Sequence, residues 1–310
     1  MRPATEICAN GIDEDCDGAA DDGCVPNDLF ANATTVALGA AEVTIVGSTV
    51  GAARDGATVP CGCTTGGNVW YRFTLASTAV VYLDTAGSSY DTSLWITDAA
   101  GTPIGGQSGT GRPDAGVCND DAGCTGLGGF GLRDSQTWAY LSAGTYYVSV
   151  SGCSTGAFAL HLQQVPTSSA SYFYATRLSG MATTSTVLVG TSAQTSICGG
   201  AASGEDARWF VTCGGQQQFF SLCSGDGGTF TRSNGTTSFD PSLYIRSAQS
   251  GAEVTCNDDG GTACVGTGGD TANYGSRLTN VVVPRGLHVL YVDERVGGSG
   301  MSYTLAYTVR

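Results

Sequence analysis

Apolar residues in this chain occur only in short stretches of about five to eight residues, and this feature constrains the fold most strongly. Several stretches alternate apolar and polar side chains, as in Val69, Tyr71, Phe73 and Leu75. The same alternation occurs at 158–162 and 303–309. Because successive side chains of a strand point to opposite faces, each pattern places its apolar set on one face of a sheet. Together with 47 glycines, the alternation predicts strands and loops almost throughout, and so an all-β fold.

A divergent repeat divides the chain into two halves. The matching landmarks are Trp70 and Trp209, Asp91-Thr92-Ser93-Leu94 and Asp240-Pro241-Ser242-Leu243, Cys-Asn-Asp-Asp at 118–121 and 256–259, and strands at 143–148 and 285–290. The spacings between landmarks differ, as expected where strands match and surface loops vary. A short polar stretch at 165–169 follows a complete last strand. We therefore expect an acidic, cysteine-rich segment at 1–26, one β-sandwich domain at 27–166 and a second at 167–310.

The chain is strongly acidic, with a formal net charge of −14, and all of its basic residues are arginines. A surface of this sign repels phosphate, so we expect no nucleic-acid partner, and cations are the natural counterpart. The absence of lysine excludes Schiff-base chemistry and lysine isopeptide crosslinks. No apolar run approaches the roughly 20 residues that cross a bilayer, so we expect no membrane insertion.

Thirteen cysteines, without the spacing of a tetrahedral zinc site, indicate an oxidised framework and an extracellular or cell-surface location. An odd count leaves one free thiol or a link to another chain. The bridges that spacing favours are Cys118–Cys124, Cys256–Cys264 and Cys213–Cys223, with one further bridge among Cys8, Cys16 and Cys24. Cys61, Cys63, Cys153 and Cys198 have no preferred partner.

The landmarks of the first half resemble those of bacterial pre-peptidase C-terminal domains. They are Asn27-Asp28 with Ala31, Asp91 to Leu94, Cys-Asn-Asp-Asp, and Leu141 to Val148; the second half lacks the opening Asn-Asp. The resemblance implies two tandem jelly-roll-like β-sandwich domains and a role beside a secreted peptidase. Cys8 to Gly18, with Asp21 and Cys24, resembles the short MopE-like metal-binding motif of secreted bacterial proteins, whose name implies copper. Oxygen ligands suit a harder ion better, so we expect a short N-terminal segment stabilised by a disulfide and a metal.

The first candidate metal site lies in this N-terminal segment. Asp13, Asp15, Asp17, Gly18 and Asp21 occupy positions 1, 3, 5, 6 and 9 of a calcium loop. Position 12 is a cysteine, so we expect no EF-hand helices. The alternative is a solvated acidic tail held by cysteines.

The two Cys-Asn-Asp-Asp turns are the second candidate. They become calcium sites if an aspartate at the start of the preceding strand folds over the same loop. In the first half this set is Asp120 and Asp121 with Asp91; in the second half it is Asp258 and Asp259 with Asp240. The alternative is a tight turn closed by a disulfide, because Asn and Asp favour such turns without any metal.

No catalytic motif accompanies the two histidines, His161 and His288, and we expect no enzyme. His161 is expected to face solvent. Trp95 and Tyr244 could form a sugar-stacking surface, although half-buried strand positions are the favoured interpretation. The sequence thus favours a non-catalytic secreted or cell-surface calcium-binding module for adhesion, matrix assembly or substrate attachment. Its partner would be an extracellular protein, a polysaccharide or a copy of itself. The alternatives are a structural subunit of an extracellular filament and an accessory domain pair of a secreted peptidase.

Overall fold

The structure is a computed structural model, and its described residues form two compact units. Unit 1 ends at Val165, and the described part of unit 2 begins at Leu178, so the expected boundary at 166–167 lies outside the described residues. The described residues are 12, 13, 16, 18, 24–55, 65–104, 118–122, 133–165, 178, 180–187, 194–199, 205–232, 240–261, 264, 265, 274–294 and 301–309.

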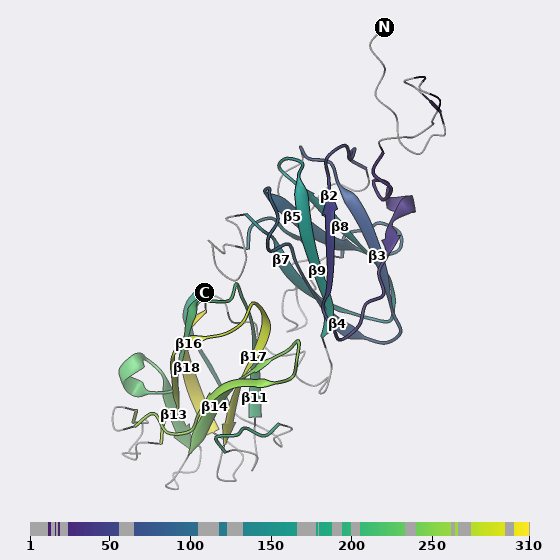
Figure 1. The fold of residues 1–310 in the computed structure, drawn as a ribbon. Helices are drawn as coiled ribbons and strands as arrows, with labels where there is room; N and C mark the ends of the chain where they lie inside the picture. Colours follow the sequence, from purple (N-terminus) through teal and green to yellow (C-terminus); the bar gives the residue numbers. More distant parts are fainter. Residues whose placement is uncertain are drawn as a thin grey trace. The chain divides into compact units, whose positions relative to one another are not determined.

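The described residues of unit 1 form strands and one 3-10 turn (Figure 1). In chain order these are η1 (Phe30–Asn32), β1 (Thr34–Thr35), β2 (Val43–Ser48), β3 (Val69–Leu75), β4 (Ala79–Asp84), β5 (Thr92–Thr97), β6 (Cys118–Asn119), β7 (Gln136–Leu141), β8 (Gly144–Gly152) and β9 (Ala157–Val165). The strands form two sheets that we name by a central strand. The β8 sheet has the order β1-β3-β8-β5-β6, and the β9 sheet has the order β2-β9-β4-β7.

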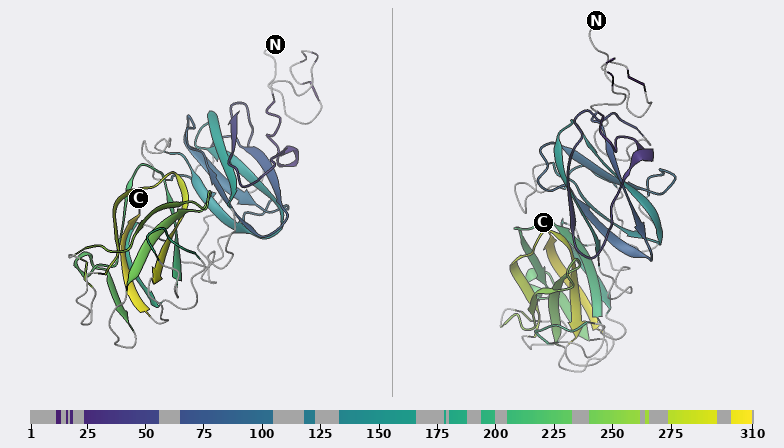
Figure 2. Two further views of the ribbon diagram at one scale, coloured as in Figure 1. Left: turned by 60° about the horizontal axis from the view of Figure 1, so that its bottom comes forward. Right: turned by 45° about the vertical axis from the view of Figure 1, so that its right-hand side comes forward.

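Unit 2 repeats this arrangement (Figure 2). Its elements are β10 (Gly180–Val187), β11 (Glu205–Thr212), β12 (Gln217–Ser221), η3 (Ser224–Asp226), β13 (Thr229–Arg232), β14 (Pro241–Ser247), β15 (Glu253–Asn257), β16 (Arg277–Val282), β17 (Gly286–Glu294) and β18 (Met301–Val309). The β17 sheet has the order β11-β17-β14-β15, and the β18 sheet has the order β10-β18-β12-β16, with β13 also paired to β18.

The two units share one topology, which is that of a jelly roll. Setting aside the short β1 in unit 1 and β13 in unit 2, eight strands remain among the described residues of each unit. Numbered from one to eight, they form sheets of order 1-8-3-6 and 2-7-4-5 in both units. This order is that of two interlocked Greek keys. The predicted fold class, two tandem jelly-roll-like β-sandwiches, is therefore confirmed.

The apolar faces predicted from alternation form the cores. In unit 1 the alternating apolar residues of β3 pack with those of β9, and in unit 2 those of β18 pack with apolar residues of β11, β14 and β17. Each core therefore lies between the two sheets of its unit. The residues are Val69, Tyr71, Phe73, Leu75, Phe158, Leu160 and Leu162 in unit 1, and Tyr303, Leu305, Tyr307, Val309, Phe210, Leu243 and Leu290 in unit 2.

Strand register corrects one landmark of the repeat. Trp70 pairs with Ser149, which in turn pairs with Trp95. In unit 2 the matching row is Ala207, Tyr291 and Tyr244. Trp209 therefore lies two residues beyond the position that corresponds to Trp70, because side chains on one face of a strand recur every two residues.

Two predicted disulfides are wrong, since Cys256 is bonded to Cys198 and Cys223 to Cys264. Cys256 pairs across the sheet with Tyr244 and lies on the face of β15 away from the core, whereas Cys264 is fully buried near Phe230. A predicted Cys256–Cys264 bridge would have to join opposite sides of the sheet. The predicted Cys213–Cys223 bridge is wrong because Cys223 is bonded to Cys264; β11 and β12, which precede the two predicted partners, are also not adjacent strands of one sheet, as the prediction had assumed.

The remaining cysteines are only partly described. Cys24, Cys118, Cys153 and Cys213 are disulfide-bonded, and the described Cys16 carries a free, exposed thiol. Cys8, Cys61, Cys63 and Cys124 lie outside the described residues, so Cys118–Cys124 stays a prediction.

Candidate metal centre

Each unit brings its Cys-Asn-Asp-Asp turn to the start of the strand that follows the predicted aspartate. In unit 1, Leu94 of β5 pairs with Asn119 of β6, and in unit 2, Leu243 of β14 pairs with Asn257 of β15. Antiparallel pairing places the residues before one strand beside the residues after the other. Asp91 and Asp240 therefore reach the same sheet end as the turns.

The asparagine of each turn is used by the fold itself. The Nδ2 group of Asn119 donates to the carbonyl of Asp121, and that of Asn257 donates to the carbonyl of Asp259, both at 3.2 Å. The Oδ1 atoms accept from the backbone N–H groups of Gln136 and Arg277, both at 2.8 Å. These amides shape the turn and join it to the next strand, so they are not available as metal ligands.

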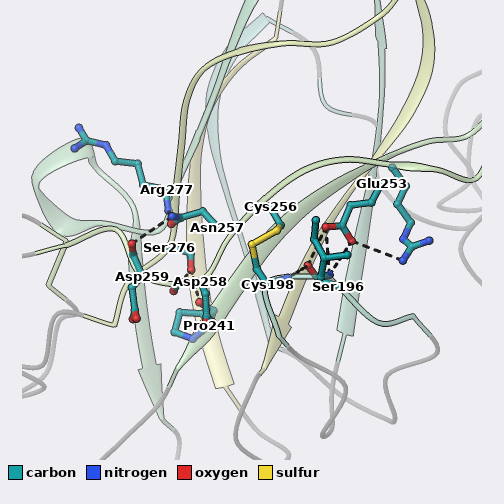
Figure 3. The surroundings of a disulfide bond; sticks show 12 residues. Ser196, Cys198, Pro241, Glu253, Cys256, Asn257, Asp258, Asp259, Ser276 and Arg277 are labelled. Carbon is teal, nitrogen blue, oxygen red and sulfur yellow. Dashed lines mark hydrogen bonds and ion pairs between the residues drawn. A yellow bond between two sulfur atoms is a disulfide. The ribbon is translucent and has the colours of Figure 1, made fainter.

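A serine ties the turn to the preceding strand in both units. The Ser135 hydroxyl lies 2.6 Å from the carbonyl of Thr92 and 3.0 Å from that of Asp120. The Ser276 hydroxyl contacts the carbonyls of Pro241 and Asp258 in the same way. Figure 3 shows Ser276, Pro241, Asn257 and Asp258 gathered at this end of unit 2. The local structure is therefore the same in both halves of the repeat.

In unit 1 two carboxylates meet at this sheet end. Asp91, Asp120 and Cys153 each offer one ligand atom, and these atoms lie within 4.8 Å of one another. Cys153 is disulfide-bonded, so its sulfur is no thiolate and adds nothing to a hard-cation site. The Oδ1 atom of Asp91 is buried and accepts no hydrogen bond. Two carboxylates on opposite sides of one small space can hold a cation that prefers oxygen.

An arginine already lies against this pair. Nη1 of Arg133 donates to Oδ2 of Asp91 at 2.8 Å, while 65% of the arginine side chain is exposed. The pKa of Arg133 is raised, first by this hydrogen bond and then by the charges of Asp91, Asp121 and Asp120. Arg133 therefore supplies part of the positive charge that these carboxylates require.

Unit 2 has the same aspartates without that arginine. Arg133 precedes Ser135 by two residues, and the residue that precedes Ser276 by two is Tyr274. Asp240 and Asp258 occupy the positions of Asp91 and Asp120. The Oδ1 atom of each is buried and accepts no hydrogen bond, while both residues make other interactions. The arginine that pairs with Asp91 in unit 1 therefore has no counterpart at this position of unit 2, where Arg277 instead takes the place of Gln136 and pairs with Asp226.

The last aspartate of each turn has a different role. Asp121 and Asp259 are exposed, and their backbone carbonyls accept the asparagine hydrogen bonds described above. These two predicted ligands therefore help to form the turn through their backbone carbonyls. Their side chains are exposed and are not among the buried carboxylates of the site.

The N-terminal candidate is described only in part. Oδ2 of Asp13 accepts from the backbone N–H of Gly18 at 2.9 Å, which closes a tight loop. Cys16, inside this loop, has a left-handed backbone with φ of 60°. Asp15, Asp17 and Asp21 lie outside the described residues, so this metal loop stays a prediction.

Asp28 is a buried carboxylate that sequence reasoning did not select. Its exposed fraction is 1%, and neither carboxylate oxygen accepts a hydrogen bond of ordinary geometry. Burial raises its pKa, with the charge of Asp55 adding to the effect and the nearby Ala53 N–H opposing it. Asp55 itself accepts from the Phe30 N–H at 2.7 Å and the Trp70 indole at 2.5 Å. The sequence feature that could have pointed to Asp28 is the pair Asn27-Asp28 before the first strand, followed later in the chain by Asp55.

Both histidines and both candidate sugar-stacking aromatics are occupied by the fold. His161 does not face solvent as expected, because its ring nitrogens contact Glu42 at 3.3 Å and the Ala86 carbonyl at 3.2 Å. His288 is fully buried with Nε2 2.8 Å from the Pro284 carbonyl, and burial lowers its pKa to about 4. Trp95 and Tyr244 are 1% and 0% exposed, so neither offers a face to a sugar.

Comparison with known proteins identifies no family. No family model matches the chain, and no curated protein matches it. Solved structures resemble it only weakly. One is a provisionally assigned secreted protein from Eubacterium rectale, with 10% identity, a TM-score of 0.21, and coverage of 78% of this chain and 69% of that one. Another is the CUB1-EGF-CUB2 region of human MASP-1/3, with 8% identity, a TM-score of 0.21, and coverage of 86% and 99%. Likenesses this weak carry no argument about function.

One further observation bears on location. At least two disulfides join described residues of unit 2, Cys198–Cys256 and Cys223–Cys264. Within the described ranges, no helix has the length and apolar character needed to cross a membrane.

Proposed function

We propose that this chain is a non-catalytic secreted or cell-surface module that binds calcium at the two turn-bearing sheet ends and presents the ordered loops to an extracellular protein or polysaccharide. One observation supports the proposal: in both units a serine hydroxyl bonds to the carbonyl of the turn aspartate, Asp120 or Asp258, and to the carbonyl of the residue that follows Asp91 or Asp240. A purely structural turn needs the asparagine and the serine. It does not need an aspartate at both facing positions.

The ligand atoms favour calcium over a softer metal. The facing side chains offer carboxylate oxygens, and the neighbouring sulfur in unit 1 is part of a disulfide. Calcium takes six to eight oxygen ligands and tolerates irregular geometry, so backbone carbonyls and water would complete the shell. Copper and zinc prefer imidazole and thiolate ligands instead.

The absence of catalysis is part of the proposal and is supported by how the polar groups are used. His288 is neutral and buried at physiological pH, and His161 is engaged with Glu42 and a carbonyl. Neither ring is therefore placed to act as a general base on a substrate. Disulfide bonding supports a location outside the cytoplasm, because cytoplasmic reductants keep most thiols reduced.

The experiment is thermal unfolding of the full chain with calcium and with a chelator. Calcium bound only to the folded state must raise the free energy of unfolding by mass action, by about 2.7 kcal/mol at one hundred times Kd, and the unfolding midpoint rises with it. The Asp91→Asn and Asp240→Asn variants should each lose part of the rise. The matched controls are Asp121→Asn and Asp259→Asn, which alter exposed carboxylates of the same turns. Equal midpoints with calcium and chelator in the wild type would contradict the proposal.

A second candidate, a structural subunit of an extracellular filament, is favoured by the sheet edges. β2 and β10 are edge strands at the same position of the two jelly rolls. Each exposes a large apolar side chain, Val46 at 79% and Met181 at 78%. An edge strand with open hydrogen-bonding groups can pair with another chain. Sedimentation should then detect concentration-dependent assembly that Met181→Lys abolishes; a monomer at every concentration would contradict this alternative.

A further inference from the structure

Strand β10 forms an open edge of the β18 sheet in unit 2. It pairs with β18 over all eight of its residues, and among the described strands none pairs with its other side. Ala182 and Thr184 lie opposite Tyr307 and Leu305, so they are on the core-facing side of the sheet. Ala182 is nevertheless exposed, and Thr184 is only half-buried. Solvent therefore reaches this edge even on its core-facing side.

The edge lacks the features that normally keep such strands from pairing with another chain. Natural edge strands are protected by charged side chains, proline, bulges or short length. β10 has the sequence Gly-Met-Ala-Thr-Thr-Ser-Thr-Val, and its register with β18 is continuous. No Asp, Glu, Lys or Arg occurs from 178 to 204. On the solvent-facing side of β10, Met181 is 78% exposed, so an apolar side chain accompanies the open backbone.

The other described edge strands each carry at least one protective feature. β11 and β15 contain Glu205 and Glu253. β13 contains Arg232, and β16 contains Arg277 together with a break in its register with β12. β1 and β6 are two residues long, β2 directly follows Glu42, and β7 is almost wholly buried. β10 is therefore the longest uncharged edge strand in the described part of the chain.

The sequence of β10 is suited to pairing with itself. Two copies of one strand that pair antiparallel are related by a two-fold axis, and directly opposed residues share a face. With the axis at Thr184, Met181 lies opposite Val187 and Thr183 lies opposite Ser185. Apolar residues then meet apolar residues, hydroxyls meet hydroxyls, and no charge enters the contact. An axis at Thr183 would instead place Met181 opposite Ser185 and leave Val187 unpaired, so the first register is favoured.

Charge favours a second copy as the occupant of this edge. The chain has a formal net charge of −14, so two copies repel one another over most of their surfaces. Association must therefore use an uncharged surface, and β10 provides one. A partner attracted by charge would bind the acidic surface instead of this neutral strand. Because salt screens the repulsion between copies, association through β10 should strengthen as the salt concentration rises.

We propose that β10 pairs with β10 of a second copy of this chain, antiparallel about an axis at Thr184, and joins the two β18 sheets into one continuous sheet. The contact uses the same surface on both copies, so assembly ends at two copies. This dimer shares the β10 edge with the filament alternative, but it requires neither β2 nor calcium at the turns.

The experiment is sedimentation equilibrium of the full chain in chelator, at low and at high salt. All proteins carry Cys16→Ser, so that the exposed free thiol cannot form an intermolecular disulfide. The unaltered β10 edge should give a monomer–dimer equilibrium whose Kd falls as salt rises. Met181→Lys should raise Kd about tenfold or more, because the symmetric contact contains the substitution twice. The matched control is Val46→Lys, which adds the same charge at an equally exposed side chain of β2 and should leave Kd unchanged.

A pair of opposite charges tests the register. Thr183→Lys and Ser185→Glu should each weaken the dimer, because each adds a charge to a neutral contact. The combined variant should restore it, since the two new side chains then face one another across the axis with opposite charges. Both positions are exposed, and unchanged thermal midpoints would show that a lost dimer is not a lost fold.

The outcomes separate this proposal from the others. A monomer at every concentration would overturn it and leave the edge to a strand of another protein, and a dimer that Met181→Lys leaves intact would overturn it as well. Assembly beyond two copies that Val46→Lys also weakens would overturn it in favour of a filament. A β10 dimer in a chain whose thermal unfolding ignores calcium would support this proposal while refuting calcium binding at the turns.

Discussion

Acidification should destabilise unit 2 through one buried side chain, His288. The ring is fully buried in β17, 5.4 Å from the ring of Phe210, and its Nε2 atom faces the Pro284 carbonyl at 2.8 Å. Burial lowers its pKa to about 4, whereas an unfolded histidine has a pKa of about 6.5. The unfolded chain therefore takes up a proton below about pH 6.5 that the folded chain refuses until about pH 4.

The size of this effect follows from the gap between the two pKa values. Each unit of pKa difference corresponds to about 1.4 kcal/mol, so full acidification removes about 3 kcal/mol of the free energy of unfolding. Because the folded pKa is the lower one, this stability is fully present above about pH 6.5 and is lost as the pH falls toward about 4.

The assay is hydrogen exchange in urea at several pH values between 7 and 4. Peptides from β17 report on unit 2, and peptides from β8 report on unit 1, where Tyr146 holds the position of His288. The His288→Gln variant keeps a donor toward Pro284 and should flatten the pH dependence of β17. If the variant and the wild type lose the same stability on acidification, the histidine is not the cause and the reasoning fails.

Three further predictions concern other parts of the fold. Cys198→Ser/Cys256→Ser opens a loop with a sequence separation of 58 and should lower the free energy of unfolding by about 4 kcal/mol from chain entropy; urea unfolding measures it, and a loss below about 1 kcal/mol would contradict that account. In metal-free protein, unit 1 should gain stability as the pH falls through the raised pKa of Asp28, since protonation neutralises a buried charge; Asp28→Asn should remove this gain, and an unchanged slope in pH-dependent unfolding would refute it. Asn257→Ala should cost about 1–3 kcal/mol by removing the hydrogen bonds to Arg277 and Asp259, against a smaller effect for the exposed control Asp259→Ala; calorimetry compares the two.

Local patterns predicted the fold well because they depend on neighbours in sequence. Alternation in 69–75, 158–162 and 303–309 identified the faces that pack in the cores, since side-chain direction in a strand follows from the residue before it. A glycine is also the first residue of the equivalent strands β8 and β17. Gly286 has φ of 128°, which side-chain-bearing residues rarely adopt, and Gly144 holds the same position in β8.

Properties that depend on strand register could not be predicted from the sequence in the same way. The Cys256–Cys264 prediction used sequence proximity, but the face on which Cys256 lies is set by its pairing with Tyr244. Glu205, Asp293 and Ser242 lie in one row across three strands that are far apart in the chain, so no motif contains them. Asp28 was visible, yet its burial follows from the packing of the segment before β1.

Because the strand registers of the two units match, charged residues at equivalent positions can be compared directly. The backbone places a facing aspartate pair at the same sheet end in both, but unit 1 adds Arg133 where unit 2 has Tyr274. On the outer face, unit 2 has Glu205 and Asp293 where unit 1 has Asn68 and Ser151, and Asn68 donates to the carboxylate of Asp55. A nearby positive charge competes with a bound cation, and Arg133 pairs directly with Asp91. If the turns bind calcium, Arg133 should therefore weaken binding in unit 1, a contribution that is absent at the matching position of unit 2, where Tyr274 lies.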